Sequence, residues 1–133
     1  MKLTKTETDF VEPARVARLA TVDSQGILHN VPICPVFAGG RFYVGTEANA
    51  KKVRNIQANA DVTLVFDDYT ECWSRLRGVM IQGHARVVGK QEFRLLRKKF
   101  YDKFLQYEDA APLDEKDSAI IEIVPQKKFS WGF

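Results

Sequence analysis

The sequence has little of what marks a membrane, secreted or disordered protein. No apolar run approaches the roughly 20 residues that a membrane-spanning helix needs. The first ten residues, MKLTKTETDF, contain no apolar stretch typical of a secretory signal. With only 8 glycines and 5 prolines among 133 residues, a collagen-like or disordered chain is excluded. We therefore expect one soluble, cytoplasmic domain spanning residues 1–133.

The sequence also has few cysteines and histidines and a small net charge. The two cysteines, Cys34 and Cys72, and the two histidines, His29 and His84, lack the spacing of metal ligands. We predict free thiols and no metal site, with Cys34 buried in the wall of the fold. The net charge is only +3 and is spread along the chain, which gives no electrostatic footprint for nucleic acid.

Short β-type segments joined by turns make up most of the chain. Strands are expected at residues 16–22, 27–37, 41–46, 61–67, 78–88 and 118–124, the last followed by a tail. Helical spacing of apolar residues predicts helices over 49–60 and 91–105, and a shorter one over 4–12. Since hairpin turns join most strands, we predict a mainly β (α+β) fold, a six-stranded antiparallel barrel with two or three helices outside it.

One strand contains two prolines, Pro32 and Pro35, on either side of Cys34. Each proline removes a donor from the sheet ladder, so the strand is interrupted or lies at an edge. Two interpretations remain open. The prolines protect a sheet edge from aggregation, or unpaired backbone groups there face a ligand.

Lysines 51 and 52 stand where helix 49–60 begins. With Asn49 as the N-cap, both fall in the first turn, where the helix dipole disfavours cations. An anion at this helix end would engage the free N–H groups and both ammonium groups. Thr46, which precedes Lys51 by five residues and Lys52 by six, could add a hydroxyl donor. The pattern fits a phosphate site, or alternatively two solvated lysines.

The loop over residues 67–77 mixes aromatic and charged side chains. Tyr69 and Trp73 either cap the core or form the wall of a pocket for a flat ring. In the second case Arg75 or Arg77 could reach an anionic group.

Seven segments in a fixed order carry a family pattern. They are RVARLATV at 15–22, VPI at 31–33, YVGT at 43–46, KKVRNI at 51–56, WSRLR at 73–77, the strand 78–88 and SWG at 130–132. Together they resemble the pyridoxamine 5′-phosphate oxidase-like superfamily of flavin-binding split β-barrels, over almost the whole chain.

The resemblance implies a homodimer of six-stranded split barrels, with two cofactor sites at the dimer interface. Contacts to the cofactor's ring and ribityl chain are implied for Asn30, Val31, Pro32, Ile33 and Cys34. Contacts to its 5′-phosphate are implied for Thr46, Lys51 and Lys52. Contacts from the partner subunit are implied for Trp73, Arg75, Arg77 and Trp131.

The string Asp67-Asp68-Tyr69, with Trp73 and Leu76-Arg77 after it, resembles a branch often described as probable deazaflavin-dependent enzymes. The vitamin-making oxidases of the superfamily are longer and carry substrate-phosphate residues near their C-terminus that this sequence lacks. Because those residues are lacking, pyridoxamine phosphate oxidation is not the expected activity. Gly78 stands where larger residues are common in relatives, so the wall of the pocket is not assigned.

The resemblance implies an oxidoreductase that transfers a hydride to or from a small molecule. The implied cofactor is FMN, with the 8-hydroxy-deazaflavin coenzyme as the alternative. Backbone N–H groups between Val31 and Cys34 would stabilise negative charge on the reduced ring. No residue is assigned as catalytic acid or base. The alternative function is a non-catalytic module, a carrier or sensor of flavin, deazaflavin or haem.

Overall fold

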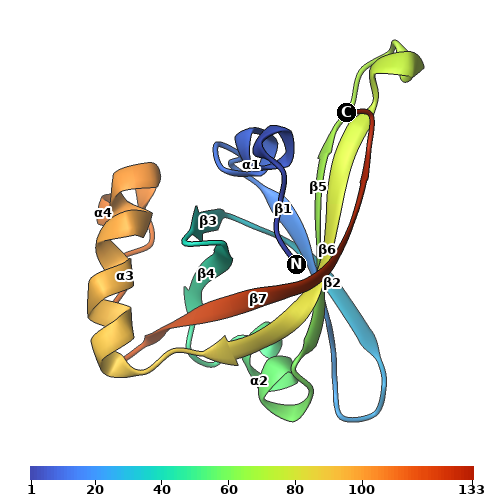
Figure 1. Cartoon of the computed structure of the whole chain (residues 1–133). Helices are drawn as coiled ribbons and strands as arrows, with labels where there is room; N and C mark the ends of the chain where they lie inside the picture. Colours follow the sequence, from blue (N-terminus) through green and yellow to red (C-terminus); the bar gives the residue numbers. More distant parts are fainter.

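The computed structural model describes residues 1–133 and is built on one seven-stranded antiparallel sheet (Figure 1). The strands are β1 (Ala17–Val22), β2 (Leu28–Ile33), β3 (Pro35–Ala38), β4 (Arg41–Glu47), β5 (Asp61–Asp68), β6 (Arg77–Val87) and β7 (Ser118–Trp131). The helices are α1 (Lys5–Val11), α2 (Lys51–Ala58), α3 (Lys90–Lys103) and α4 (Gln106–Asp109), with one 3-10 turn at Trp73–Arg75. The strand order is β2-β1-β5-β6-β7-β4-β3.

The mainly β, antiparallel architecture is confirmed, but the predicted count of six strands is wrong. The segment 27–37 divides at Cys34 into β2 and β3, which are the two outermost strands of the sheet. Pro32 pairs with β1 only, and Pro35 pairs with β4 only. Proline has no backbone N–H to donate to a neighbouring strand. It is tolerated at both positions because each lies on an edge strand, which has a partner on one side only. The prediction of an interrupted edge strand is confirmed.

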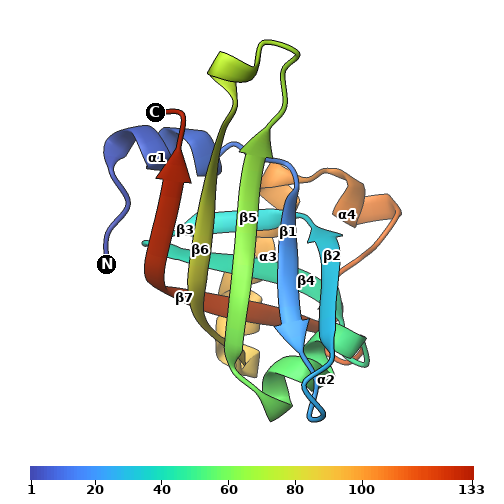
Figure 2. The ribbon, with the colours of Figure 1, turned by 90° about the vertical axis from the view of Figure 1, so that its right-hand side faces the viewer.

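The sheet curls so strongly that its two edges approach each other. In Figure 2, β5, β1 and β2 stand upright while β3 and β4 run across behind them, and β6 and β7 take part in both halves. A register shift between Gln82 and Gly83 marks the bend. The predicted end of the last strand at residue 124 is therefore wrong, since β7 passes the bend at Pro125 and continues to Trp131.

Two apolar clusters hold this curl. The larger fills the inside of the curled sheet, under α2, and contains fully buried residues such as Leu19, Phe42 and Phe66. The smaller lies between α3 and strands β3 and β4, where Phe93, Phe100 and Phe104 are buried as the helical spacing predicts. Four helices are present instead of two or three, because the single-turn α4 has too little periodicity to be seen in sequence. None of the helices is both long and apolar enough to cross a membrane.

Candidate functional site

The start of α2 leaves backbone donors free. The helix begins at Lys51 with Ala50 as its N-cap, so the prediction of Asn49 as the cap is wrong. A tight turn, in which the Ala50 N–H donates to the Glu47 carbonyl, delays the helix by one residue. Alanine has no side-chain acceptor, and the N–H groups of Lys51 and Lys52 donate to no protein atom. This end of α2 is therefore available to an external anion.

The two lysines of the first turn differ in their surroundings. Lys51 Nζ lies 3.9 Å from Oδ2 of Asp23, in the β1–β2 turn. Hydrogen bonds from the backbone N–H groups of Ile27 and Gln25 lower the pKa of Asp23, and the charge of Lys51 lowers it further. Lys52 has no carboxylate partner and lines a cavity of about 460 Å³ together with Thr46. Of the two, Lys52 is therefore the cation free to meet a ligand.

This space, which we name the Lys52 cavity, lies between the end of β4, the start of α2 and the segment after α4. Its lining residues are Gly45, Thr46, Glu47, Ala50, Lys52, Tyr107, Ala110, Ala111, Pro112, Leu113 and Ser118. A hydroxyl, an ammonium group and uncapped helical N–H groups thus meet in one place, which is the donor set of a phosphate site.

A second space, the Cys34 cavity, adjoins the first. It measures about 430 Å³ and is lined by Arg15, Cys34, Phe104, Gln106, Tyr107 and Ala111. Tyr107 and Ala111 line both cavities. Pro35, which follows Cys34, pairs with Val44, two residues before Thr46. Together the cavities form a groove with a cationic donor set at one end and an apolar wall at the other.

Cys34 is the only residue of the predicted ring-binding strand that lines the groove. The prediction that Cys34 is buried is wrong, because it is exposed where the chain passes from β2 to β3. Asn30 and Pro32 are also exposed, whereas Val31 and Ile33 point into the core. Val31 and Ile33 can therefore offer only their backbone groups to a ligand at the edge formed by β2.

None of the remaining four predicted residues lines the groove of its own chain. Trp73, Arg75, Arg77 and Trp131 stand at the upper end of the β5–β6 hairpin, beside the C-terminus, while α2 is at the opposite end (Figure 1). Tyr69 and Trp73 are 66% and 72% exposed, so they do not cap the core. Arg77 is paired with Asp68 and stacks on the ring of Phe10.

Tyr107 and Arg15 are among the groove residues that sequence reasoning missed. Tyr107 packs against the rings of Phe100 and Phe104, and burial raises the pKa of its hydroxyl to about 12. It sits in the short α4, which has no sequence signature. Arg15 lies in the pattern that carries the family resemblance, but only the tertiary structure brings it beside Cys34.

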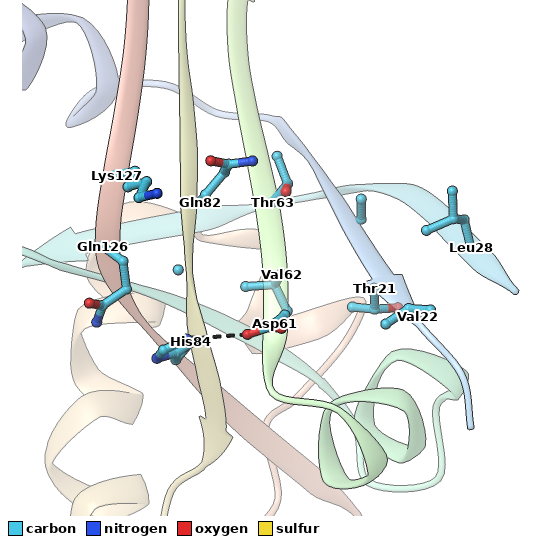
Figure 3. A pocket seen from close by; sticks show the side chains of 12 residues that line it. Thr21, Val22, Leu28, Asp61, Val62, Thr63, Gln82, His84, Gln126 and Lys127 are labelled. Atoms are coloured by element: carbon cyan, nitrogen blue, oxygen red, sulfur yellow. Dashed lines mark ion pairs between the residues drawn. The ribbon is translucent and has the colours of Figure 1, made fainter. Parts of the chain in front are cut away.

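A third cavity, of about 480 Å³, lies on the outer face of the sheet (Figure 3). Thr63, Gln82 and Gln126 line it, and His84 Nε2 lies 3.2 Å from Asp61 Oδ1 at its lower end. No group of three His, Cys, Asp or Glu side chains is placed to hold a metal. His29 is elsewhere, on β2, and its buried Nδ1 has no hydrogen-bond partner.

Comparison with known proteins identifies the family. The family model described as pyridoxamine 5′-phosphate oxidase matches residues 3–132, and the chain belongs to this family. No curated protein matches the chain.

Solved structures share the fold at low sequence identity. HutZ, the haem storage protein from Vibrio cholerae, is 19% identical, with a TM-score of 0.84 over 100% of this chain and 97% of its own. An F420 reductase is 20% identical, with a TM-score of 0.76 over 96% and 98%. An FAD-binding protein from Mesorhizobium loti is 19% identical, with a TM-score of 0.77 over 96% and 93%. Flavin, deazaflavin and haem proteins thus share this architecture, and the ligand of this chain must be argued from its own residues.

The Lys52 cavity offers the donors that the phosphate of a cofactor would need. Thr46, Lys52 and the free N–H groups of α2 would hold a phosphate. The Cys34 cavity continues from there along apolar and aromatic side chains.

Proposed function

We propose that this protein is an oxidoreductase that binds FMN, or alternatively the 8-hydroxy-deazaflavin coenzyme, with the phosphate in the Lys52 cavity and the ring along the edge from Asn30 to Cys34, beside the Cys34 cavity. The observation that carries the proposal is the uncapped start of α2, with Lys52 and Thr46 around an adjoining cavity. Lys52 has no carboxylate partner and lies in a first helical turn without an acidic residue, where a cation is unfavourable until an anion binds.

The chain's part in the chemistry is orientation and electrostatics. The bound cofactor would supply hydride transfer to or from a small-molecule substrate. Lys52 and Thr46 fix one end of the cofactor, and the edge from Asn30 to Cys34 offers unpaired backbone groups to the rest. Because its pKa is about 12, Tyr107 keeps its proton at neutral pH, so it contributes hydrogen bonds and an aromatic wall and not a base.

A visible-absorbance titration with FMN, riboflavin and the deazaflavin coenzyme tests the proposal. We expect saturable binding of FMN that is much tighter than binding of riboflavin, which lacks the phosphate. Lys52→Ala should weaken FMN binding about ten-fold or more and leave riboflavin unaffected, because it removes a charge-assisted contact. Lys51→Ala is the matched variant and should have a smaller effect, since Asp23 already compensates its charge.

Two results would contradict this assignment. Equal affinity for riboflavin and FMN would show that the phosphate does not bind at α2. Absence of binding by every flavin and deazaflavin would refute the cofactor itself.

The proposal includes a homodimer in which Trp73, Arg75, Arg77 and Trp131 complete the groove of the partner subunit. Its support is the exposure of large apolar side chains at the hairpin end, none of which lines the groove of its own chain. These side chains are Tyr69, Trp73, Phe129, Trp131 and Phe133. Apolar side chains gathered in this way mark an interaction surface.

Light scattering after size-exclusion chromatography tests the dimer. We expect twice the 15.2 kDa mass of one chain. Trp73→Ala should weaken association and FMN binding together without unfolding the chain, because Trp73 is exposed. Leu95→Ala, a comparable change at an exposed apolar residue of α3, is the control. A monomer that binds FMN at full affinity would contradict the shared site.

A second candidate, a cofactor carrier or sensor without turnover, is favoured by the likeness of the fold to that of HutZ, a haem storage protein. Neither histidine lines the groove, so haem iron would find only Cys34 or Tyr107 as a ligand there. Reduction of the bound cofactor by an electron donor, followed by its reoxidation by substrate, separates the two candidates. Both cysteines are free thiols, which supports a reducing, cytoplasmic location as part of the proposal.

A further inference from the structure

The Cys34 cavity contains one cation, Arg15, that the proposed binding of the cofactor's phosphate at α2 does not use. Among its six lining residues, Arg15 is the single charged one, and no carboxylate lines the cavity. Phe104 and Tyr107 supply aromatic faces, and Ala111 and Cys34 complete an apolar wall. A cavity with one cation and otherwise apolar walls selects an apolar ligand that carries one negative charge.

The guanidinium group of Arg15 is held by a hydrogen bond and an aromatic ring, but no carboxylate neutralises its charge. One guanidinium N–H donates to the carbonyl of Lys103 at 3.0 Å, and the guanidinium lies 4.5 Å above the centre of the Phe104 ring. On its other side Arg15 borders a cavity containing Asp9, Asp67 and Asp68, but no carboxylate oxygen lies within 4.0 Å of it. Most of its N–H donors are therefore available to a ligand.

A second cation strengthens the positive potential here. Lys103 Nζ donates hydrogen bonds to three backbone carbonyls, one of which belongs to Pro35, next to Cys34. Burial and then the charge of Arg15 lower the pKa of Lys103 to about 8. Cys34 and Glu12 act on the pKa of Lys103 in the opposite direction, and Glu12 forms no ion pair with Lys103. An anion beside Arg15 would offset the repulsion between the two cations.

We propose that the Cys34 cavity binds a flat, apolar compound carrying one carboxylate or similar anionic group, and that Arg15 is the residue that selects for this charge. In the proposed function the Cys34 cavity would be the substrate compartment beside the ring of the bound cofactor, and to that extent this inference rests on the proposed function. The substrate class is then a small aromatic or conjugated acid, not a neutral or cationic amine.

Benzoate and benzamide are suitable probes, because they share a shape and differ in charge. Calorimetric titration of the protein, with and without FMN, should show benzoate binding about ten-fold tighter than benzamide, the scale of one charge-assisted contact. Arg15→Gln should abolish this difference. Lys99→Gln is the control, because Lys99 is an exposed cation of α3 without an ion pair.

Labelling of Cys34 locates the bound probe. In a Cys72→Ser background, neutral iodoacetamide reports only on Cys34, which is exposed in this cavity. Saturating benzoate should slow the labelling several-fold in the parent and not in Arg15→Gln.

The outcomes separate this inference from the proposed function. Equal affinity for the two probes, benzoate affinity unchanged in Arg15→Gln, or labelling unaffected by benzoate would each overturn the anion site. Arg15-dependent benzoate selectivity in a protein that binds no flavin would support the site while contradicting the proposed cofactor.

Discussion

The Nζ atom of Lys103, the last residue of α3, donates a 2.7 Å hydrogen bond to the carbonyl oxygen of Pro35, the first residue of β3. The same Nζ donates to the carbonyls of Ala14 at 2.7 Å and Glu12 at 3.0 Å. One ammonium group therefore joins α3, the edge strand β3 and the segment that leads into β1. These three segments surround Cys34, so the shape of the groove depends on this contact.

Replacement of Lys103 by methionine should destabilise the protein by about 1–3 kcal/mol, because it leaves partly buried carbonyls without a donor. The folded protein lowers the pKa of Lys103 from 10.5 to about 8, so the unfolded chain binds more protons between these values. The stability of the parent should therefore rise relative to Lys103→Met as the pH increases from 8 to 10.5. Urea unfolding of both proteins across this range measures the difference, and parallel curves would contradict the assignment.

Glu7 should make the protein sensitive to acid. Burial favours the neutral carboxyl, but hydrogen bonds from Lys128, the Thr4 N–H and Ser130 overcome it and lower the pKa of Glu7 to about 2. Stability from Glu7 is thus complete above pH 4.5 and is lost as the pH falls towards 2. The loss should amount to roughly 2–3 kcal/mol.

Glu7→Gln tests this directly. The variant should be less stable than the parent at pH 6, and the two should converge as the pH approaches 2. Glu12→Gln, an exposed change at the other end of α1 without an ion pair, should follow the parent throughout. A constant gap between Glu7→Gln and the parent at every pH would argue against titration of Glu7.

Gly78→Ala should cost about 1–3 kcal/mol through overpacking. A Cβ atom at Gly78 would stand 2.2 Å from Trp131 Cζ2 and 2.7 Å from the Phe66 carbonyl oxygen. Trp131 can move aside but the backbone of β5 cannot, so adding Trp131→Ala should restore only part of the stability. Gly89→Ser, in open space at the start of α3, is the control and should be neutral or stabilising in thermal unfolding.

Thr21→Val should loosen α2 from the sheet. Asn55 Nδ2 donates a 2.9 Å hydrogen bond to Thr21 Oγ1, and the two residues are 3% and 2% exposed. Removing the hydroxyl leaves a buried amide without its acceptor, at a cost of about 1–3 kcal/mol. The double variant Thr21→Val with Asn55→Leu should lose less than the sum of the single changes. Strict additivity in chemical unfolding would show that the two side chains are not coupled.

The elements with strong local patterns were predictable from sequence. The helical spacing of Phe93, Phe100 and Phe104 predicted α3, and alternating β-branched residues predicted β1, β5 and β6. The donor set of the candidate phosphate site was predictable too, because Thr46, Lys51 and Lys52 lie within seven residues of one strand–helix junction. Local spacing alone determines which face of a helix or strand such side chains occupy.

Contacts between distant segments were decided only by the tertiary structure. The curl of the sheet makes β2 and β3 its two edges and exposes Cys34 where the chain passes between them. The packing of α3 and α4 brings Arg15 and Tyr107, which are 92 residues apart, into one cavity. The sequence thus determined the family pattern, the strand and helix types and the cationic start of α2. Packing decided which lysine is free and which side chains form the groove, because the pairing of remote strands and helices leaves no periodic trace along the chain.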